Sequence, residues 1–216
     1  MIIPISKVNR PKRLVNKKLI DKNKYFFTFN NTKFFYSQED KDMLVELKKN
    51  AYKNLNIKIC KKNLLKIRWL FNTFKIPFYL VFGTLLGAIR DNGFIKHDND
   101  VDIAILDRYV EDLCALLESN LFKMSGFKIV KAMKGIITFT RDSESIDIFI
   151  YSKYNNKYKC YTPWLIYHDP APFFDNPSVI EFLGQEFQTV QNPKRYLSLH
   201  YGRGWRKPRK NRHASF

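Results

Sequence analysis

The chain has 216 residues, of which 45% are hydrophobic and 16% aromatic, so it can bury a core, and the composition excludes global disorder. The net charge of +18 favours polyanionic partners such as nucleic acid, an anionic membrane face or phosphorylated substrates, although a lysine-rich surface without a specific partner explains it equally well. Three widely spaced cysteines give no zinc knuckle or disulfide framework, and no apolar run reaches the ~20 residues of a membrane span, so we expect a soluble protein of a reducing compartment such as the cytoplasm.

The N-terminal part is predicted to be an extension of the catalytic domain. Residues 1–36 are basic and then aromatic, and residues 26–29 and 33–36, joined at Asn30-Asn31, have the pattern of a small hairpin. A helix is predicted to begin after Ser37, whose hydroxyl precedes acidic residues. The catalytic domain is predicted over residues 37–208, and residues 209–216 form a basic tail.

The central part predicts helices that alternate with strands. Apolar residues at helical spacing indicate a helix from Ile59 to Phe74, which Pro77 ends. Gly83-Thr84 is predicted to be a turn before a short helix over residues 85–90, and Asp107 is predicted to cap a helix that runs to about Ser119. Buried strands are predicted over residues 78–82, 101–106, 127–133, 136–141 and 146–151. These elements describe an α+β fold with a mixed β-sheet flanked by helices.

The C-terminal part is predicted to be rich in loops. Four prolines argue for an irregular, packed region: Pro163, Pro170, Pro172 and Pro177. Residues 179–183 and 186–190 flank Gly184-Gln185 as in a hairpin, and Asn192-Pro193 has the pattern of an N-cap followed by proline at the first position of a helix that extends to Tyr201.

The aspartates at the start of the 101–106 strand point to a metal site. In an extended chain Asp98, Asp100 and Asp102 would lie on the same side, where their carboxylates repel each other. A hard divalent cation relieves that repulsion, and Mg²⁺ or Mn²⁺ bound by carboxylates also binds substrate phosphates. Asp98 is predicted to bind the metal directly or through a water molecule.

A further carboxylate and a glycine turn complete the predicted site. Asp147 lies among apolar residues of a strand, where a charge needs a partner; if that strand neighbours residues 101–106, Asp147 completes the metal site. The alternative for Asp147 is a strand-edge charge paired with a lysine. Gly83 and Thr84, at the start of a helix, are predicted to hold a phosphate because backbone N–H groups there bind anions.

Three separated blocks of sequence closely resemble the LicD family, which includes bacterial phosphocholine transferases and the fukutin and fukutin-related proteins of animals. The blocks are residues 83–90 (GTLLGAIR) with 93–95 (GFI) and 98–103 (DNDVDI), then 145–149 (SIDIF), and finally 192–197 (NPKRYL) with 201–205 (YGRGW) and Pro208. The resemblance extends from about Lys66 to Pro208. The chain departs from it at His97, where the family often has an aromatic residue, and at Asn99, where it often has aspartate. Residues 1–60 have no counterpart in the family, and no membrane anchor or cysteine-rich insertion is present.

The resemblance implies a nucleotidyltransferase-like fold and a reaction that moves a phospho-alcohol, such as phosphocholine or phosphoribitol, from a CDP-linked donor to a glycan hydroxyl with release of CMP. Asp100, Asp102 and Asp147 would then be the catalytic residues. The candidates for steadying the donor are Arg90, Lys96, Lys194 and Arg195, and for the first two plain surface charge is an equal alternative.

Two other functions stay open at this point. The same metal site would serve a nucleotidyltransferase that moves NMP from an NTP to a small molecule, a protein or an RNA. A non-enzymatic, basic nucleic-acid-binding protein would explain the charge and the aromatic residues of the N-terminal part, but it gives no reason for clustered aspartates, which repel a phosphate backbone.

Overall fold

The computed structural model describes residues 54–132, 135–162 and 165–208, the backbone of Met133, and the backbone of the strands at residues 2–4, 24–29 and 32–37. The predicted helix after Ser37 and the predicted basic tail lie outside the described residues. The predicted N-terminal hairpin is confirmed, because β2 (Lys24–Phe29) and β3 (Thr32–Ser37) pair antiparallel.

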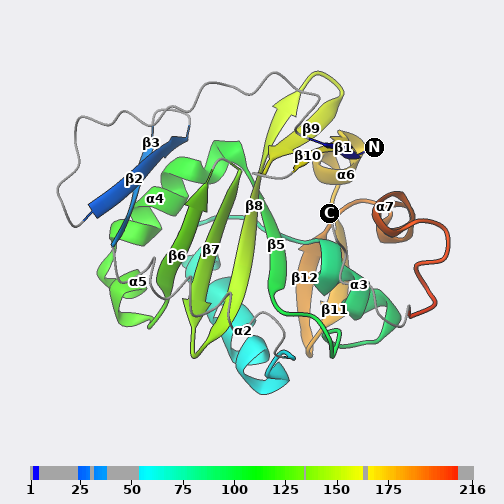
Figure 1. Cartoon of the computed structure of the whole chain (residues 1–216), viewed down its shortest axis with the longest axis horizontal. Helices are drawn as coiled ribbons and strands as arrows, with labels where there is room; N and C mark the ends of the chain where they lie inside the picture. The colour runs from blue at the N-terminus through cyan, green and yellow to red at the C-terminus, as the bar shows by residue number, and fades with distance from the viewer. Residues whose placement is uncertain are drawn as a thin grey trace.

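A 10-stranded mixed sheet forms the centre of the molecule (Figure 1). Its strands are β1 (Ile2–Pro4), β4 (Tyr79–Leu80), β5 (Val101–Leu106), β6 (Lys128–Met133), β7 (Ile136–Arg141), β8 (Glu144–Tyr154), β9 (Lys157–Tyr161), β10 (Leu165–Pro170), β11 (Ser178–Phe182) and β12 (Gln185–Thr189). The helices of this part of the chain are α2 (Ile57–Thr73), α3 (Phe82–Arg90), η2 (Asp107–Tyr109), α4 (Val110–Glu118), α5 (Asn120–Met124), α6 (Pro172–Asp175) and α7 (Pro193–Tyr201).

The strand order places two distant parts of the sequence side by side. It runs β1-β10-β9-β8-β5-β4-β12-β11, with β7 and then β6 added at β8. The long β8 strand pairs with β7 and β5 along its first part and with β9 at its end. Because β5 and β8 are parallel, Asp102 lies directly opposite Asp147.

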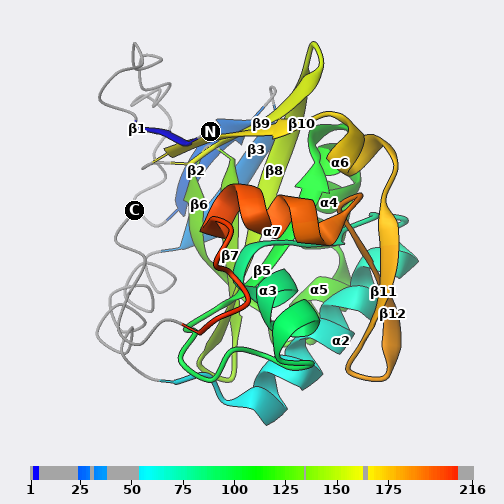
Figure 2. The ribbon, with the colours of Figure 1, turned by 90° about the vertical axis from the view of Figure 1, so that its right-hand side faces the viewer.

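Helices cover both faces of the sheet, with α3 and α7 on one face and α2, α4 and α5 on the other (Figure 2). Side chains of a strand alternate between the faces. On β5, Val101, Ile103 and Ile105 are each fully buried, whereas Asp102 faces α3, whose Gly83 it contacts. Among the described residues, no helix combines the length and apolar character that crossing a membrane requires.

The mixed α+β architecture confirms the predicted fold class, and most elements lie where they were predicted. The strands at residues 101–106 and 136–141 match their predicted bounds. The hairpin of β11 and β12 is present, and the Asn192 side chain caps α7 by accepting a hydrogen bond from the Arg195 N–H at 3.2 Å.

Three local predictions differ from the structure. Gly83 and Thr84 are not a turn, because α3 begins at Phe82, whose φ of 42° turns the chain directly from β4 into the helix. The Asp107 side chain makes no cap hydrogen bond; Asp107 begins η2. The proline region is more regular than predicted, because Pro170 ends β10 and Pro172 begins α6.

Candidate active site

Three carboxylates converge where the chain enters β5. Asp98, Asp100 and Asp102 each offer an oxygen atom, and these atoms lie within 4.8 Å of one another. Asp102 is in β5, and the other two lie in the segment that leads into the strand. The structure therefore brings together the three aspartates that the sequence predicted to share one side, although only Asp102 is in the strand itself.

The start of α3 holds Asp102 in place. The Gly83 N–H donates to Asp102 Oδ2 at 2.8 Å, and the Asp102 N–H donates to Thr84 Oγ1 at 2.8 Å. A Cβ atom at position 83 would lie 2.9 Å from Asp102 Oδ2 and even closer to Asp98 Oδ2, so a larger residue does not fit there. The structure gives Gly83 and Thr84 the role of positioning a carboxylate; their direct contact with a phosphate stays a prediction.

Asp147 borders this cluster from the neighbouring strand. It lies opposite Asp102 in the parallel pair of β5 and β8, and registered residues of parallel strands point to the same face. Its Oδ1 accepts a hydrogen bond from Thr138 Oγ1 of β7, and its Oδ2 lies 3.9 Å from Lys131 Nζ of β6. Asp147 therefore has features of both interpretations: it is paired with Lys131, and it faces the side of the sheet that carries Asp102.

Burial and mutual repulsion disfavour the charged forms of these carboxylates. Burial raises the pKa of Asp102 well above its usual range, and the charges of Asp100, Asp98 and Asp147 raise it further. The pKa of Asp100 is also raised well above its usual range, by burial first and then by Asp147 and Asp98. Burial raises the pKa of Asp98 to about 6, against the Asn99 amide and the Arg90 charge, which lower it. A cluster of this kind fits a hard divalent cation, which would offset the repulsion at neutral pH.

Two tyrosines lie near enough to the cluster for the charge of Asp102 to affect their pKa values. Tyr167 in β10 and Tyr201 at the end of α7 have raised pKa values, caused by burial first and then by the charge of Asp102. The centroid of the Phe82 ring lies 4.7 Å from the ring centroids of both Tyr167 and Phe149, so these three aromatic side chains pack together. Tyr201 belongs to a sequence block quoted for the family resemblance, whereas Tyr167 lies outside those blocks.

The predicted basic residues are distributed unevenly around the cluster. Arg90 is near enough for its charge to lower the pKa of Asp98, but its guanidinium is paired with Asp91 at 2.8 and 2.7 Å. Lys96 is exposed in the loop before Asp98. Lys194 and Arg195 are exposed in the first turn of α7, about 10 Å along the helix axis from Tyr201, which lies by the aspartates. The structure brings Arg90 to the site and leaves Lys194 and Arg195 at the other end of α7.

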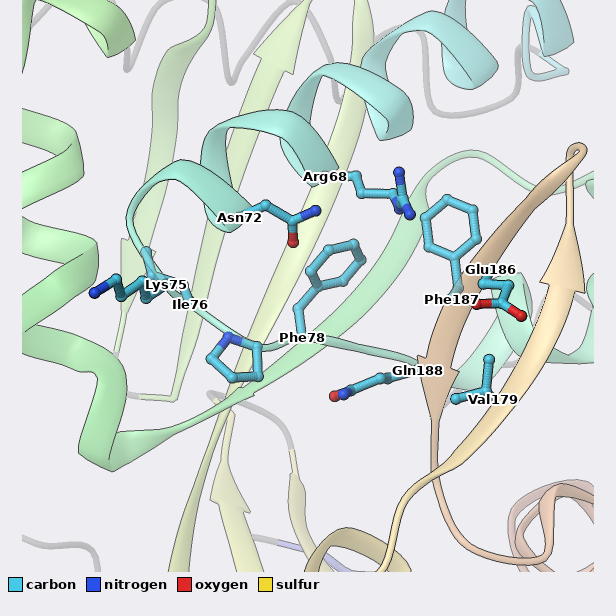
Figure 3. Close-up of a pocket in the computed structure, with 10 residues that line it drawn as sticks. Arg68, Asn72, Lys75, Ile76, Phe78, Val179, Glu186, Phe187 and Gln188 are labelled. Carbon is cyan, nitrogen blue, oxygen red and sulfur yellow. The ribbon is translucent and has the colours of Figure 1, made fainter.

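A separate cavity of about 490 Å³ lies between α2 and the hairpin of β11 and β12 (Figure 3). Arg68, Asn72 and Lys75 line it from α2 and its C-terminal end, and Glu186, Phe187 and Gln188 line it from β12. The four site aspartates do not line it, so this cavity is distinct from the carboxylate cluster.

Comparison with known proteins gives one extended match and several partial ones. The family model described as LicD/FKTN/FKRP, nucleotidyltransferase domain, matches residues 75–189. An uncharacterized protein of Rickettsia typhi is 34% identical over 83 residues, which are 38% of this chain and 25% of that protein, so the chain spans about a quarter of the relative it matches.

Two solved structures with names connected to antibiotics are similar to part of this chain. The lincomycin-bound lincosamide antibiotic adenylyltransferase LnuA has a TM-score of 0.46 and 17% identity, over 64% of this chain and 84% of that one. The antibiotic-resistance factor ANT(2'')-Ia in solution has a TM-score of 0.46 and 12% identity, over 68% of this chain and 73% of that one.

Proposed function

The chain belongs to the LicD/FKTN/FKRP nucleotidyltransferase family, and on that premise we propose that it is a metal-dependent transferase that moves a phospho-alcohol from a CDP-linked donor to a glycan hydroxyl and releases CMP. The observation that carries the proposal is the convergence of Asp98, Asp100 and Asp102 within 4.8 Å, with Asp147 opposite Asp102 on the neighbouring strand. An arrangement of four acidic side chains beside the start of a helix suits a metal-bound diphosphate better than a surface turn.

Asp98, Asp100, Asp102 and Asp147 would hold Mg²⁺ or Mn²⁺. A bound divalent ion would supply Lewis-acid stabilisation of the charge that develops on the diphosphate. The protein fixes Asp102 through the Gly83 N–H and the Thr84 hydroxyl, so one ligand needs little reorganisation when the donor binds.

Alternatively, Asp147 would accept the proton of the incoming hydroxyl. Thr138 and Lys131 orient its carboxylate toward the face of the sheet that carries Asp102. Tyr167 and Tyr201 would exclude water from the reacting groups, and Arg90 and Lys96 would steady the diphosphate. For Lys194 and Arg195, contact with the donor requires a substrate that extends along α7.

A donor panel tests this function against the alternatives. The protein is incubated with CDP-alcohols and with NTPs, with and without Mg²⁺ or Mn²⁺, and released CMP and pyrophosphate are measured. We expect metal-dependent CMP release from at least one CDP-alcohol. Pyrophosphate from an NTP would instead identify a nucleotidyltransferase that transfers NMP. Release of neither product, together with salt-sensitive, metal-independent RNA binding, would overturn the proposal in favour of a nucleic-acid-binding protein.

A further inference from the structure

Helix α2 carries a concentrated positive charge on the outside of the molecule. Its 17 residues include no acidic side chain and five basic ones: Lys58, Lys61, Lys62, Lys66 and Arg68. Its buried residues form one continuous stripe: Cys60, Asn63, Leu64, Ile67, Leu70 and Phe71. The helix therefore turns one face to the core and leaves Lys58, Lys61 and Lys62 exposed.

Apolar side chains lie along the middle of the outward face. At about 100° per residue, Lys58, Lys62, Leu65 and Trp69 fall on the same side of the helix. Trp69 is 48% exposed, which is unusual for a side chain of this size, and Leu65 is half-buried. The Lys66 ammonium lies 4.9 Å from the centroid of the Trp69 ring. The outward face thus has an apolar centre flanked by lysines.

We propose that α2 docks the protein onto an anionic phospholipid bilayer, with Trp69 at the level of the headgroups and the lysines against lipid phosphates. Tryptophan is enriched at membrane interfaces, and lysine stems lie along apolar surface while their ammonium groups reach the headgroups. The exposed cations of this face are lysines, which act as point charges, whereas Arg68 is only half-exposed, with its guanidinium 5.6 Å from the Phe187 ring centroid. A convex helix with lysines around one tryptophan suits a flat anionic surface better than the grooves and bases of nucleic acid.

The docking face begins next to the carboxylate cluster. The Leu55 N–H donates to the Asp98 carbonyl at 3.3 Å, and Asn56 caps α2 immediately afterwards. At the other end, Arg68 and Lys75 line the cavity of Figure 3, where Glu186 is the one acidic lining residue. The outward face of α2 and the aspartates lie on opposite faces of the sheet, so only the N-terminal end of α2 borders the site, and membrane binding does not depend on the proposed reaction.

Vesicle sedimentation tests the proposal. The full chain is mixed with phosphatidylcholine vesicles that contain about a third phosphatidylserine, and with vesicles of phosphatidylcholine alone. We expect binding to the anionic vesicles only. Each lysine near an anionic surface contributes about fivefold in affinity, and the introduced glutamates also repel the surface, so K58E/K61E/K62E is expected to bind at least about a hundredfold more weakly. The matched control, K128E/K157E/K207E, changes the net charge equally at exposed lysines outside α2 and is expected to bind as the unchanged protein does.

The tryptophan gives an independent measurement. The fluorescence of the unchanged protein is expected to shift to the blue when anionic vesicles are added, and Trp69→Phe is expected to lose that shift while its circular dichroism stays the same. If both triple variants lost the same affinity for anionic vesicles, the proposal would be overturned, because the net charge of the protein rather than α2 would then account for binding. The proposal would also be overturned, in favour of nucleic acid, if the unchanged protein failed to bind anionic vesicles but bound an RNA oligonucleotide that K58E/K61E/K62E no longer bound.

Discussion

Gly83 lies where the packing of the carboxylate cluster leaves no room for a side chain. A Cβ atom at this position would lie 2.9 Å from Asp102 Oδ2, and the Asp98 carboxylate is closer still. The requirement for glycine is steric, since φ at Gly83 is not in the left-handed region. The residue keeps two carboxylates against the backbone of α3, from which the Gly83 N–H binds one of them.

The Gly83→Ala variant is expected to displace both carboxylates and to weaken divalent metal binding by about ten- to a hundredfold, the usual effect of disturbing the support of a metal ligand. Mn²⁺ titration followed by electron paramagnetic resonance measures it. The control is Gly93→Ala, because a Cβ atom there meets its nearest neighbour, the Asp91 carbonyl oxygen, at 3.8 Å. Unchanged Mn²⁺ affinity in Gly83→Ala would show that the cluster is not the metal site.

Asp100 is the central test of the proposed chemistry. The Asp100→Asn variant is expected to lower CMP release by about a thousandfold, because it removes a carboxylate that is proposed to bind the metal. Its melting temperature without metal is expected to rise, because the substitution also removes a charge that repels Asp102. The exposed Asp142 provides the matched control, Asp142→Asn. Turnover near that of the unchanged enzyme would refute the assignment.

Residue patterns alone were sufficient for the aspartates but not for their neighbours. Asp98, Asp100 and Asp102 alternate within a short segment, so the alternation of an extended chain predicted that they share one side, although only Asp102 is in β5. Tyr167 lies in β10, in a proline-containing region that was predicted to be irregular. Gly83 was predicted to hold a phosphate; the structure shows that it also leaves room for the carboxylates of Asp98 and Asp102.

At the level of elements, the turn between β7 and β8 determines which residues lie beside Asp147. Asp142 and Ser143 have φ values of 53° and 62°, as in the tight turns that join two strands. A two-residue turn at this point sets Thr138 opposite Asp147. The predicted strands, residues 136–141 and 146–151, leave four residues between them, so they did not predict this contact. The approach of Lys131 was not predictable either, because the register shifts between Ile129 and Lys131.

The start of α2 depends on a long-range contact with β8. Glu144 is buried, and its Oε1 accepts a hydrogen bond from the Asn56 N–H at 3.1 Å, while Oε2 accepts one from Cys60 Sγ at 3.6 Å. Burial, and then the Glu144 charge, raise the pKa of the Cys60 thiol to about 12, so this thiol stays protonated at neutral pH. The helical pattern of α2 was clear in the sequence, but its attachment to the sheet was not.

The Glu144→Ala variant is expected to lower the free energy of unfolding by about 2 kcal/mol, because the Asn56 N–H and the Cys60 thiol lose their acceptor. Urea denaturation measures the change. Glu181→Ala, at an exposed position of β11, is the control and is expected to change stability by less than about 0.5 kcal/mol. Equal stability of the two variants would contradict a structural role for Glu144.

For the whole molecule, the carboxylate cluster makes stability depend on pH and metal together. The folded-state pKa values of Asp98, Asp100 and Asp102 are raised above those of the unfolded chain, so the folded state binds protons more tightly. The stability that these groups contribute in acid is therefore lost as the pH rises from about 4 through the raised pKa values. A divalent cation bound at the proposed site would replace those protons and restore that stability.

Because of this cluster, the melting temperature measured in EDTA is expected to be lower at pH 8 than at pH 5. Mn²⁺ is expected to raise the melting temperature more at pH 8 than at pH 5. The D98N/D100N/D102N variant isolates the contribution, since it should show neither the metal effect nor this part of the pH dependence. A metal-induced rise of equal size at both pH values would contradict the argument.

The parallel pairing of β5 with β8 also sets when the site can form. Asp102 and Asp147 meet only after the intervening helices and the β6–β7 hairpin have closed a long loop, and such contacts form slowly. During synthesis, a nascent chain exposes Asp98, Asp100 and Asp102 before Asp147 has left the ribosome. Recovery of tight cation binding after refolding would accordingly report the completed sheet rather than its nucleation.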